Sequence, residues 1–284
     1  MPQGTRRARG GVSERRVLRA YNGPMRRLIS RAFVLSLVAL SSAGCLRATT
    51  TIELKPDGSG TVVQETAMTA QALTMLKSIG AQQGGANPTA DMFSEEEARK
   101  AAATMGVTFV SGEPIKTAEM EGYRARYSFS DITKVRVDMQ QGTPAGTSSG
   151  GNQPPFAFAM DRSGPTSVLT IKMPETPGGG PLPGLPAGGS DAEKAQAQQA
   201  LTMMKVMMQG LFVDVSMNID GKVVKSNVPT EGSKVTLLQI DVDKLFADPT
   251  AMEKLQAATT LKSLSGIPGL KVPAEPTVTI EFAR

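Results

Sequence analysis

The chain has 284 residues, enough for one large domain or two small ones, and it contains no histidine. That absence removes the commonest general base, the commonest metal ligand and every histidine-containing catalytic triad. The net charge of +5 would suggest a nucleic-acid partner, but nine Arg and one Glu precede Cys45, a balance of +8, so 5 − 8 leaves about −3 on the rest. We therefore expect no nucleic-acid partner for the chain that follows Cys45.

Residues 25–44 are typical of a lipoprotein signal peptide. Three arginines lead into an apolar run at 32–40, which is shorter than the roughly 20 residues that span a bilayer. Small residues then precede Cys45, the single cysteine of the chain, where a lipoprotein signal peptidase would cut. We predict cleavage before Cys45 and attachment of lipid, including palmitate, to this residue. A buried core helix beside a structural cysteine is the alternative.

The residues around this segment refine the predicted location. Ser42 stands where the lipobox of bacterial lipoproteins usually carries Leu, Val or Ile. Leu46 follows the cysteine, in place of the Asp that retains many lipoproteins at the inner membrane of Gram-negative bacteria. We predict a cell-envelope protein anchored to the membrane on the exported side, at the outer membrane if the source is Gram-negative. Residues 1–24 are rich in arginine and are predicted to be an over-extended N-terminus before Met25.

The first part of the chain after Cys45 predicts two antiparallel strand pairs and two helices. In chain order these are strands at 49–55 and 61–66, helices at 69–82 and 94–106, and strands at 107–116 and 123–129. A Pro-Asp-Gly turn joins the first two strands. Ser94 can cap the second helix, with Glu97 as its capping-box partner, and Gly106 ends it.

The second part contains two low-complexity tracts, 140–155 and 174–190, which are predicted to be solvated loops. The predicted elements are strands at 156–161 and 167–173, a helix at 191–209, strands at 211–219, 222–225 and 235–240, a helical turn at 243–247, a helix at 251–263 and a strand at 277–282. Asp220-Gly221 predicts a tight hairpin between two of these strands, and Asp243 is expected to cap the helical turn. The whole pattern predicts a single α+β domain over 45–284, with a largely antiparallel sheet of β-hairpins packed against a few amphipathic helices.

The predicted helix at 191–209 carries a dense group of methionines, whose flexible side chains suit adaptable apolar surfaces. Some of these apolar residues point away from the line of Leu201, so the helix has more apolar surface than a narrow core stripe requires. The candidate surface for an apolar ligand or a partner consists of Leu201, Met203, Met204, Val206, Met207 and Met208. The alternative is a helix buried against the sheet.

Several phrases of the sequence resemble the LppM-type domain of bacterial lipoproteins. The phrases are residues 57–63, 218–227, 231–236 and 241–246, and with the strand that follows Cys45 they cover about half of the chain after that residue. In such domains a strand with a Gly turn, an Asn after the next strand and a Gly-x-x-Val-Thr strand occur in this order. Leu237-Leu238 replaces the usual aromatic residue. The resemblance implies an envelope-anchored α+β domain for which lipid is a candidate ligand, and it assigns no catalytic residue.

We expect a protein that is not an enzyme and has no cofactor or metal site. Ser148 matches a nucleophile-elbow pattern but lies in a low-complexity tract, without the strand and helix that the elbow needs. Residues 216–221 begin like a calcium loop, but Asn227 stands where the closing Glu belongs. The leading hypothesis is a lipid-anchored domain that binds a lipid or an envelope partner between its sheet and its Met-rich helices. A structural or assembly lipoprotein acting through protein contacts is the alternative, and an envelope hydrolase is the third.

Overall fold

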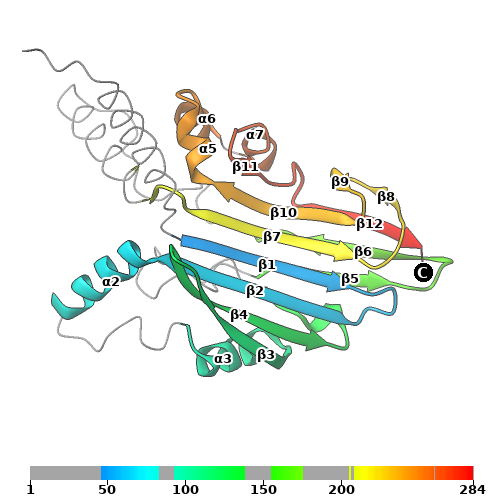
Figure 1. Ribbon diagram of the computed structural model, residues 1–284. Coiled ribbons are helices and arrows are strands. Elements are labelled where there is room, and N and C mark those ends of the chain that lie inside the picture. Colours follow the sequence, from blue (N-terminus) through cyan, green and yellow to red (C-terminus); the bar gives the residue numbers. More distant parts are fainter. Residues whose placement is uncertain are drawn as a thin grey trace, which may run out of the picture. The chain divides into compact units, whose positions relative to one another are not determined.

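The computed structural model describes residues 46–82, 93–137, 155–174, 205, 208–258 and 260–283, which belong to one compact unit. Its elements are β1 (Leu46–Leu54), β2 (Gly60–Thr69), α2 (Ala70–Gln82), α3 (Glu95–Met105), β3 (Thr108–Lys116), β4 (Met120–Phe129), the 3-10 helix η1 (Ile132–Lys134), β5 (Ala157–Asp161), β6 (Thr166–Lys172), β7 (Phe212–Ile219), β8 (Val223–Ser226), β9 (Thr230–Glu231), β10 (Lys234–Asp241), α5 (Val242–Ala247), α6 (Ala251–Ala257), α7 (Leu261–Leu264), β11 (Leu270–Lys271) and β12 (Thr277–Ala283). The strands form two sheets (Figure 1).

The larger sheet has the strand order β11-β10-β7-β1-β2-β4-β3, with β9 paired to β10, and the smaller sheet has the order β5-β6-β12-β8. Among the described residues every strand pair is antiparallel except β1 with β7, which is parallel. The predicted α+β class with a largely antiparallel arrangement is therefore confirmed. The sequence predicted one sheet, and the structure has two.

The β1–β2 hairpin is present where the alternation predicted it. Ile52 and Leu54 are fully buried on one face of β1, and Glu53 between them is exposed. In the turn, Asp57 accepts hydrogen bonds from the hydroxyl and the amide of Ser59 at 2.7 and 2.9 Å, and Gly58 adopts a φ of 85° that favours glycine. These two bonds hold the pKa of Asp57 below its ordinary value. Local chemistry therefore favours this hairpin, and the other elements of the core bury its apolar face.

The two sheets share one core. Ile52, Val62 and Met217 of the larger sheet belong to the same buried cluster as Leu169, Ile171, Ile280 and Phe282 of the smaller sheet. Tyr127 on β4 is in this cluster, and burial raises the pKa of its hydroxyl to about 12. Because each sheet has one apolar face, joining the two faces removes both from water.

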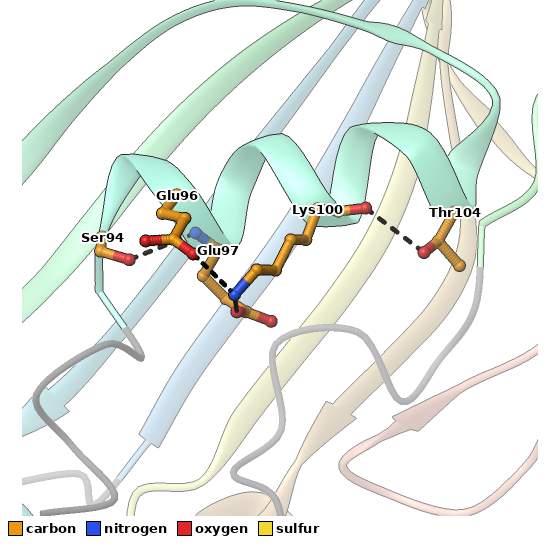
Figure 2. Close-up of polar contacts among 5 residues, drawn as sticks. All are labelled: Ser94, Glu96, Glu97, Lys100 and Thr104. Atoms are coloured by element: carbon orange, nitrogen blue, oxygen red, sulfur yellow. Dashed lines mark hydrogen bonds and ion pairs between the residues drawn. The ribbon is translucent and has the colours of Figure 1, made fainter.

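Helix α3 begins and ends as its sequence predicts, and Figure 2 shows polar contacts along the helix. The Ser94 hydroxyl accepts a hydrogen bond from the Glu97 amide at 3.2 Å, and Gly106 ends the helix with a φ of 69°. Lys100 pairs with Glu96 at 3.0 Å on the exposed face. Ala98, Ala102 and Met105 line the opposite face and are buried in the shared core. The helix therefore covers part of the core with its apolar face.

The predicted hairpin at Asp220-Gly221 is wrong. β7 pairs with β1 and β10 in the larger sheet, whereas β8 pairs with β12 in the smaller one, so this turn carries the chain from one sheet to the other. The Asp220 amide donates to the Leu54 carbonyl at 2.8 Å. A Cβ on Gly221 would lie 2.7 Å from the Ala283 carbonyl oxygen. Glycine is needed here because two backbones approach closely, and the same dipeptide would also suit a tight hairpin turn.

Asn227 fastens β8 to the last strand. Its side-chain amide donates to the Thr277 carbonyl at 2.9 Å and to Glu275 at 3.0 Å, and its side-chain oxygen accepts from the Thr279 amide at 2.8 Å. One side chain thus satisfies both an N–H and a C=O of β12 beyond the short ladder of β8. This gives a structural reason for the Asn that follows a strand in the phrase 218–227.

The predicted helix at 251–263 is two helices, α6 and α7. Ala258 has an extended backbone with φ −74° and ψ 118°, and Thr260 caps α7 in a reciprocal pair with Ser263. Leu255, Ala258 and Ile267 are buried in a small cluster separate from the shared core. The break lets the chain fold back over this cluster, which a single straight helix could not enclose.

Candidate functional site at the Leu46 end of the sheet

Most of the predicted site residues lie outside the described residues. They are Cys45, Leu201, Met203, Met204, Val206 and Met207. Most of the tracts 140–155 and 174–190 and most of the predicted helix at 191–209 also lie outside the described residues. Met208 is described and partly buried, and the Leu211 amide donates to its carbonyl at 3.0 Å. The site can therefore be built from the neighbours of these residues that the structure does describe.

The parallel pairing of β1 with β7 brings the described residues that follow the two predicted features to one end of the larger sheet. Arg47 lies opposite Phe212 in the register. Cys45 precedes Arg47 by two residues, and Met208 precedes Phe212 by four. We call this the Leu46 end of the sheet, and the opposite end, where β1 stops, the Leu54 end. Figure 1 shows α2 and α5 at the Leu46 end as well, attached to β2 and β10.

An apolar cluster separate from the shared core occupies this end. Leu46, Met68 and Leu73 are buried in it, and Ala72, Phe93 and Leu211 pack against them while partly exposed. Leu46 and Met68 are cross-strand partners, and Leu73 is supplied by the first turn of α2. The cluster joins β1, β2 and α2 to the residue that precedes β7, so it fixes the start of β1 in place.

The start of α5 holds the residues that follow Met208. The Gly210 amide donates to the Asp243 carboxylate at 2.7 Å, and the Val242 amide donates to the Leu211 carbonyl at 3.1 Å. The Lys205 ammonium lies 5.9 Å from the ring centroid of Phe246 on α5. The sequence prediction for Asp243 is wrong, because the helix cap is Asp241, which accepts from the Lys244 amide at 3.1 Å. Asp243 instead binds the glycine that precedes β7.

Asp241 makes this cap dependent on pH. Partial burial by itself would raise the pKa of Asp241, but hydrogen bonds from Lys244 and the ion pair with its ammonium at 2.8 Å outweigh it and lower the pKa. A lowered pKa in the folded state stabilises the fold above the ordinary value and loses that effect as the pH falls through the lowered one. We expect Asp241→Ala to cost about 1 kcal/mol of unfolding free energy at pH 7.

Urea denaturation at pH 7 and at pH values below 4 would measure this effect. Asp241→Asn is the matched control, because asparagine caps helices equally well and does not titrate. The free-energy difference between wild type and Asp241→Asn should shrink at the lower pH. A difference that stays constant across this range would show that the Asp241 carboxylate does not contribute through its charge.

Sequence reasoning missed the aromatic pairs of this end and one acidic residue of the sheet. The Arg47 guanidinium lies 5.1 Å from the ring centroid of Phe212, a contact that only the strand register reveals.

Asp214 lies between Thr49 and Gln239 on the face of β7 opposite Val215. It is 7% exposed, and its Oδ1 is buried without a hydrogen-bond partner. In the sequence, the only sign of this buried carboxylate was a single Asp inside an apolar strand segment.

Comparison with known proteins found no matching family model and no matching curated sequence. One solved structure similar to the chain is the NMR structure of the folded domain of Mycobacterium tuberculosis LppM, at 10% identity and a TM-score of 0.35, over 84% of this chain and 91% of that one. It is the type of domain that the sequence resembles.

Within the described ranges, no group of three acidic, histidine or cysteine residues is placed to hold a metal ion. No helix in that part of the chain is long and apolar enough to cross a bilayer.

Proposed function

We propose that the protein is a lipid-anchored lipoprotein of the cell envelope, held by lipid on Cys45, whose exported domain binds a lipid at the Leu46 end of its sheet. The observation that carries the proposal is the parallel register of β1 and β7. It attaches Cys45 and the Met-rich segment that ends at Met208 to adjacent strands at the same end. A ligand-binding surface at that end would lie close to the membrane from which a lipid comes.

The side chains of the proposed surface suit an apolar ligand. Methionine is flexible and polarisable, so a Met-rich helix adapts to acyl chains of different shapes. Phe93 and Leu211 are partly exposed around the buried cluster of Leu46, Met68 and Leu73. Apolar groups with a few polar neighbours are typical of small-molecule sites. Arg47 supplies a charge at the same end, over Phe212 on the opposite face of the sheet. The proposed role is binding without catalysis, in keeping with a sequence that lacks histidine.

A structural or assembly role through protein contacts is the second candidate. β3 is an edge strand of the larger sheet, and Val110 on it is 54% exposed. An exposed edge can pair with a strand of another protein. The bulge between Phe109 and Ser111 and the proline at position 114 both interrupt regular pairing there, which favours the lipid-binding role.

Native mass spectrometry of the full-length protein, purified in detergent from the membrane fraction, would test the proposal. We expect a bound lipid at defined stoichiometry in addition to the covalent anchor, and solvent extraction would identify its class. Met203→Glu and Met207→Glu should each reduce the bound lipid at least tenfold, because a carboxylate is costly beside an acyl chain. Val224→Glu is the control, since Val224 is 57% exposed on β8.

A protein with its covalent anchor but no additional bound lipid, even after incubation with envelope lipids, would contradict the binding role. The assembly role would then be tested by cross-linking in intact cells, with Val110→Lys as the variant expected to abolish the cross-linked species.

A further inference from the structure

We propose that the Leu46 end of the larger sheet rests directly against the bilayer surface, with β1 leading away from the membrane and the Leu54 end facing water. The inference rests on the lipid anchor proposed at Cys45. It goes beyond anchoring, because a lipidated domain on a flexible spacer would have no preferred orientation. The partner is the headgroup region of the membrane.

The first observation is that no spacer separates Cys45 from the folded domain. Leu46 is the first residue of β1 and is only 6% exposed, packed in the cluster with Met68 and Leu73. Neighbouring Cα atoms are about 3.8 Å apart, so the lipidated residue can lie no further than that from an ordered strand. The lipid chains enter the bilayer from Cys45, and the start of β1 must therefore stay at the membrane surface.

The second observation is the kind of side chain at this end. Arg47 lies over Phe212, and Lys205 lies over Phe246. Arg and Lys combine an apolar stem with a charged tip, and Lys or Arg together with Phe is found on surfaces that lie in the headgroup region. A third such pair, Arg99 over Phe109, is formed by α3 and β3 and lies toward the Leu54 end, because Phe109 is opposite Tyr127, Tyr127 is opposite Val62 and Val62 is opposite Ile52. Two of the three described pairs therefore lie at the Leu46 end.

The charges of this end suit lipid headgroups of either sign. Asp241 is paired with Lys244, and Asp243 accepts from the Gly210 amide. The β3–β4 turn adds Lys116, Glu119 and Glu121, since β4 starts opposite the end of β2. Positive and negative side chains are thus interspersed, so the contact does not require acidic lipids.

The Leu54 end is formed by turns built on aspartate. Its turns contain Asp57, Asp131 and Asp161, each of which accepts a hydrogen bond from a residue two positions further along its own turn. The Gly58 carbonyl accepts from the Ile132 amide at 2.9 Å, which brings the first two of these turns together. β1 spans nine residues from Leu46 to Leu54, so the two ends are eight steps apart, about 26 Å at the usual rise of a strand. Turns in which an aspartate side chain accepts hydrogen bonds from the backbone are typical of the water-exposed surface.

The chain contains no tryptophan, so single Trp variants are clean reporters of depth. Phe212→Trp places a reporter at the Leu46 end. Val224→Trp is the matched control, two residues beyond Lys222, whose carbonyl accepts from the Ala283 amide near the Leu54 end. The full-length lipidated proteins would be incorporated into phosphatidylcholine vesicles carrying a nitroxide at the headgroup. We expect the fluorescence of Phe212→Trp to fall at least twofold relative to vesicles without nitroxide, and that of Val224→Trp to change by less than a tenth.

Two controls separate the possible failures. Intact mass and co-flotation with vesicles report whether the anchor is present, and a protein without it would overturn both the proposed function and this inference. An anchored, folded protein whose two reporters are quenched equally, or in which only Val224→Trp is quenched, would overturn the orientation alone. Phe246→Trp, also at the Leu46 end, is a second reporter in case Phe212→Trp does not fold, and the same twofold decrease is expected for it.

Discussion

Replacing Cys45 with alanine is expected to abolish incorporation of palmitate into the protein completely. The lipid is proposed to attach through the sulfur of this residue, and the chain contains no other cysteine. Two acyl chains are needed for stable membrane attachment, because a single chain binds only marginally. Metabolic labelling of cells that express the wild type or Cys45→Ala, followed by immunoprecipitation, would measure the effect. The variant should also retain its leader and migrate as a larger protein.

Ser41→Ala is the control for this experiment. It changes a small residue of the leader to another small residue and should leave labelling and cleavage unchanged. Palmitate that remains on Cys45→Ala would place the lipid on another residue and would contradict the proposed anchor.

Phe282→Ala is expected to produce the largest loss of stability, about 3–5 kcal/mol of unfolding free energy. Phe282 on β12 is fully buried in the cluster that both sheets share. Truncating its ring removes contacts on the smaller sheet and leaves a cavity facing the larger one. Because domains of this kind are typically stable by 5–15 kcal/mol, the loss would be a large part of the total. Urea denaturation followed by circular dichroism would measure it.

Val224→Ala on the neighbouring strand β8 is the control, because its side chain is 57% exposed and its loss should change stability by about 0.5 kcal/mol or less. A loss below about 1.5 kcal/mol for Phe282→Ala would indicate that the two sheets do not share one tightly packed core at this position.

Local patterns in the sequence were sufficient to predict most individual elements. The β1–β2 hairpin and helix α3 are specified by nearby residues, Asp57 with Ser59 in the turn and Ser94 with Gly106 at the helix ends. Alternation of buried and exposed residues also predicted β3, β4, β6, β10 and β12 to within a few residues. These features depend on contacts between residues that are close in the chain, so they can be recognised without knowing the fold.

Pairing between distant strands could not be predicted in this way. An Asp-Gly dipeptide suits a tight hairpin and equally suits the crossing between sheets at Gly221, because both need a residue without a side chain. The parallel pair β1–β7 joins segments that no local signal connects. For the same reason the sequence predicted Cys45 and the Met-rich segment as separate features. The register of that pair is what places Arg47 beside Phe212.

The β1–β7 pair also sets an order of events for folding. Arg47 and its partner Phe212 are 212 − 47 = 165 residues apart. The hairpin of β1 with β2 can form as soon as residue 69 is available, whereas the other edge of β1 has no partner until β7 is made. For the exported domain proposed here, that interval depends on passage across the membrane and on closure of a long loop, and both are slow beside hairpin formation, which takes about 1–10 μs. During it the central strand of the larger sheet has an unpaired edge, so we expect slow completion of the sheet and a period of vulnerability to aggregation.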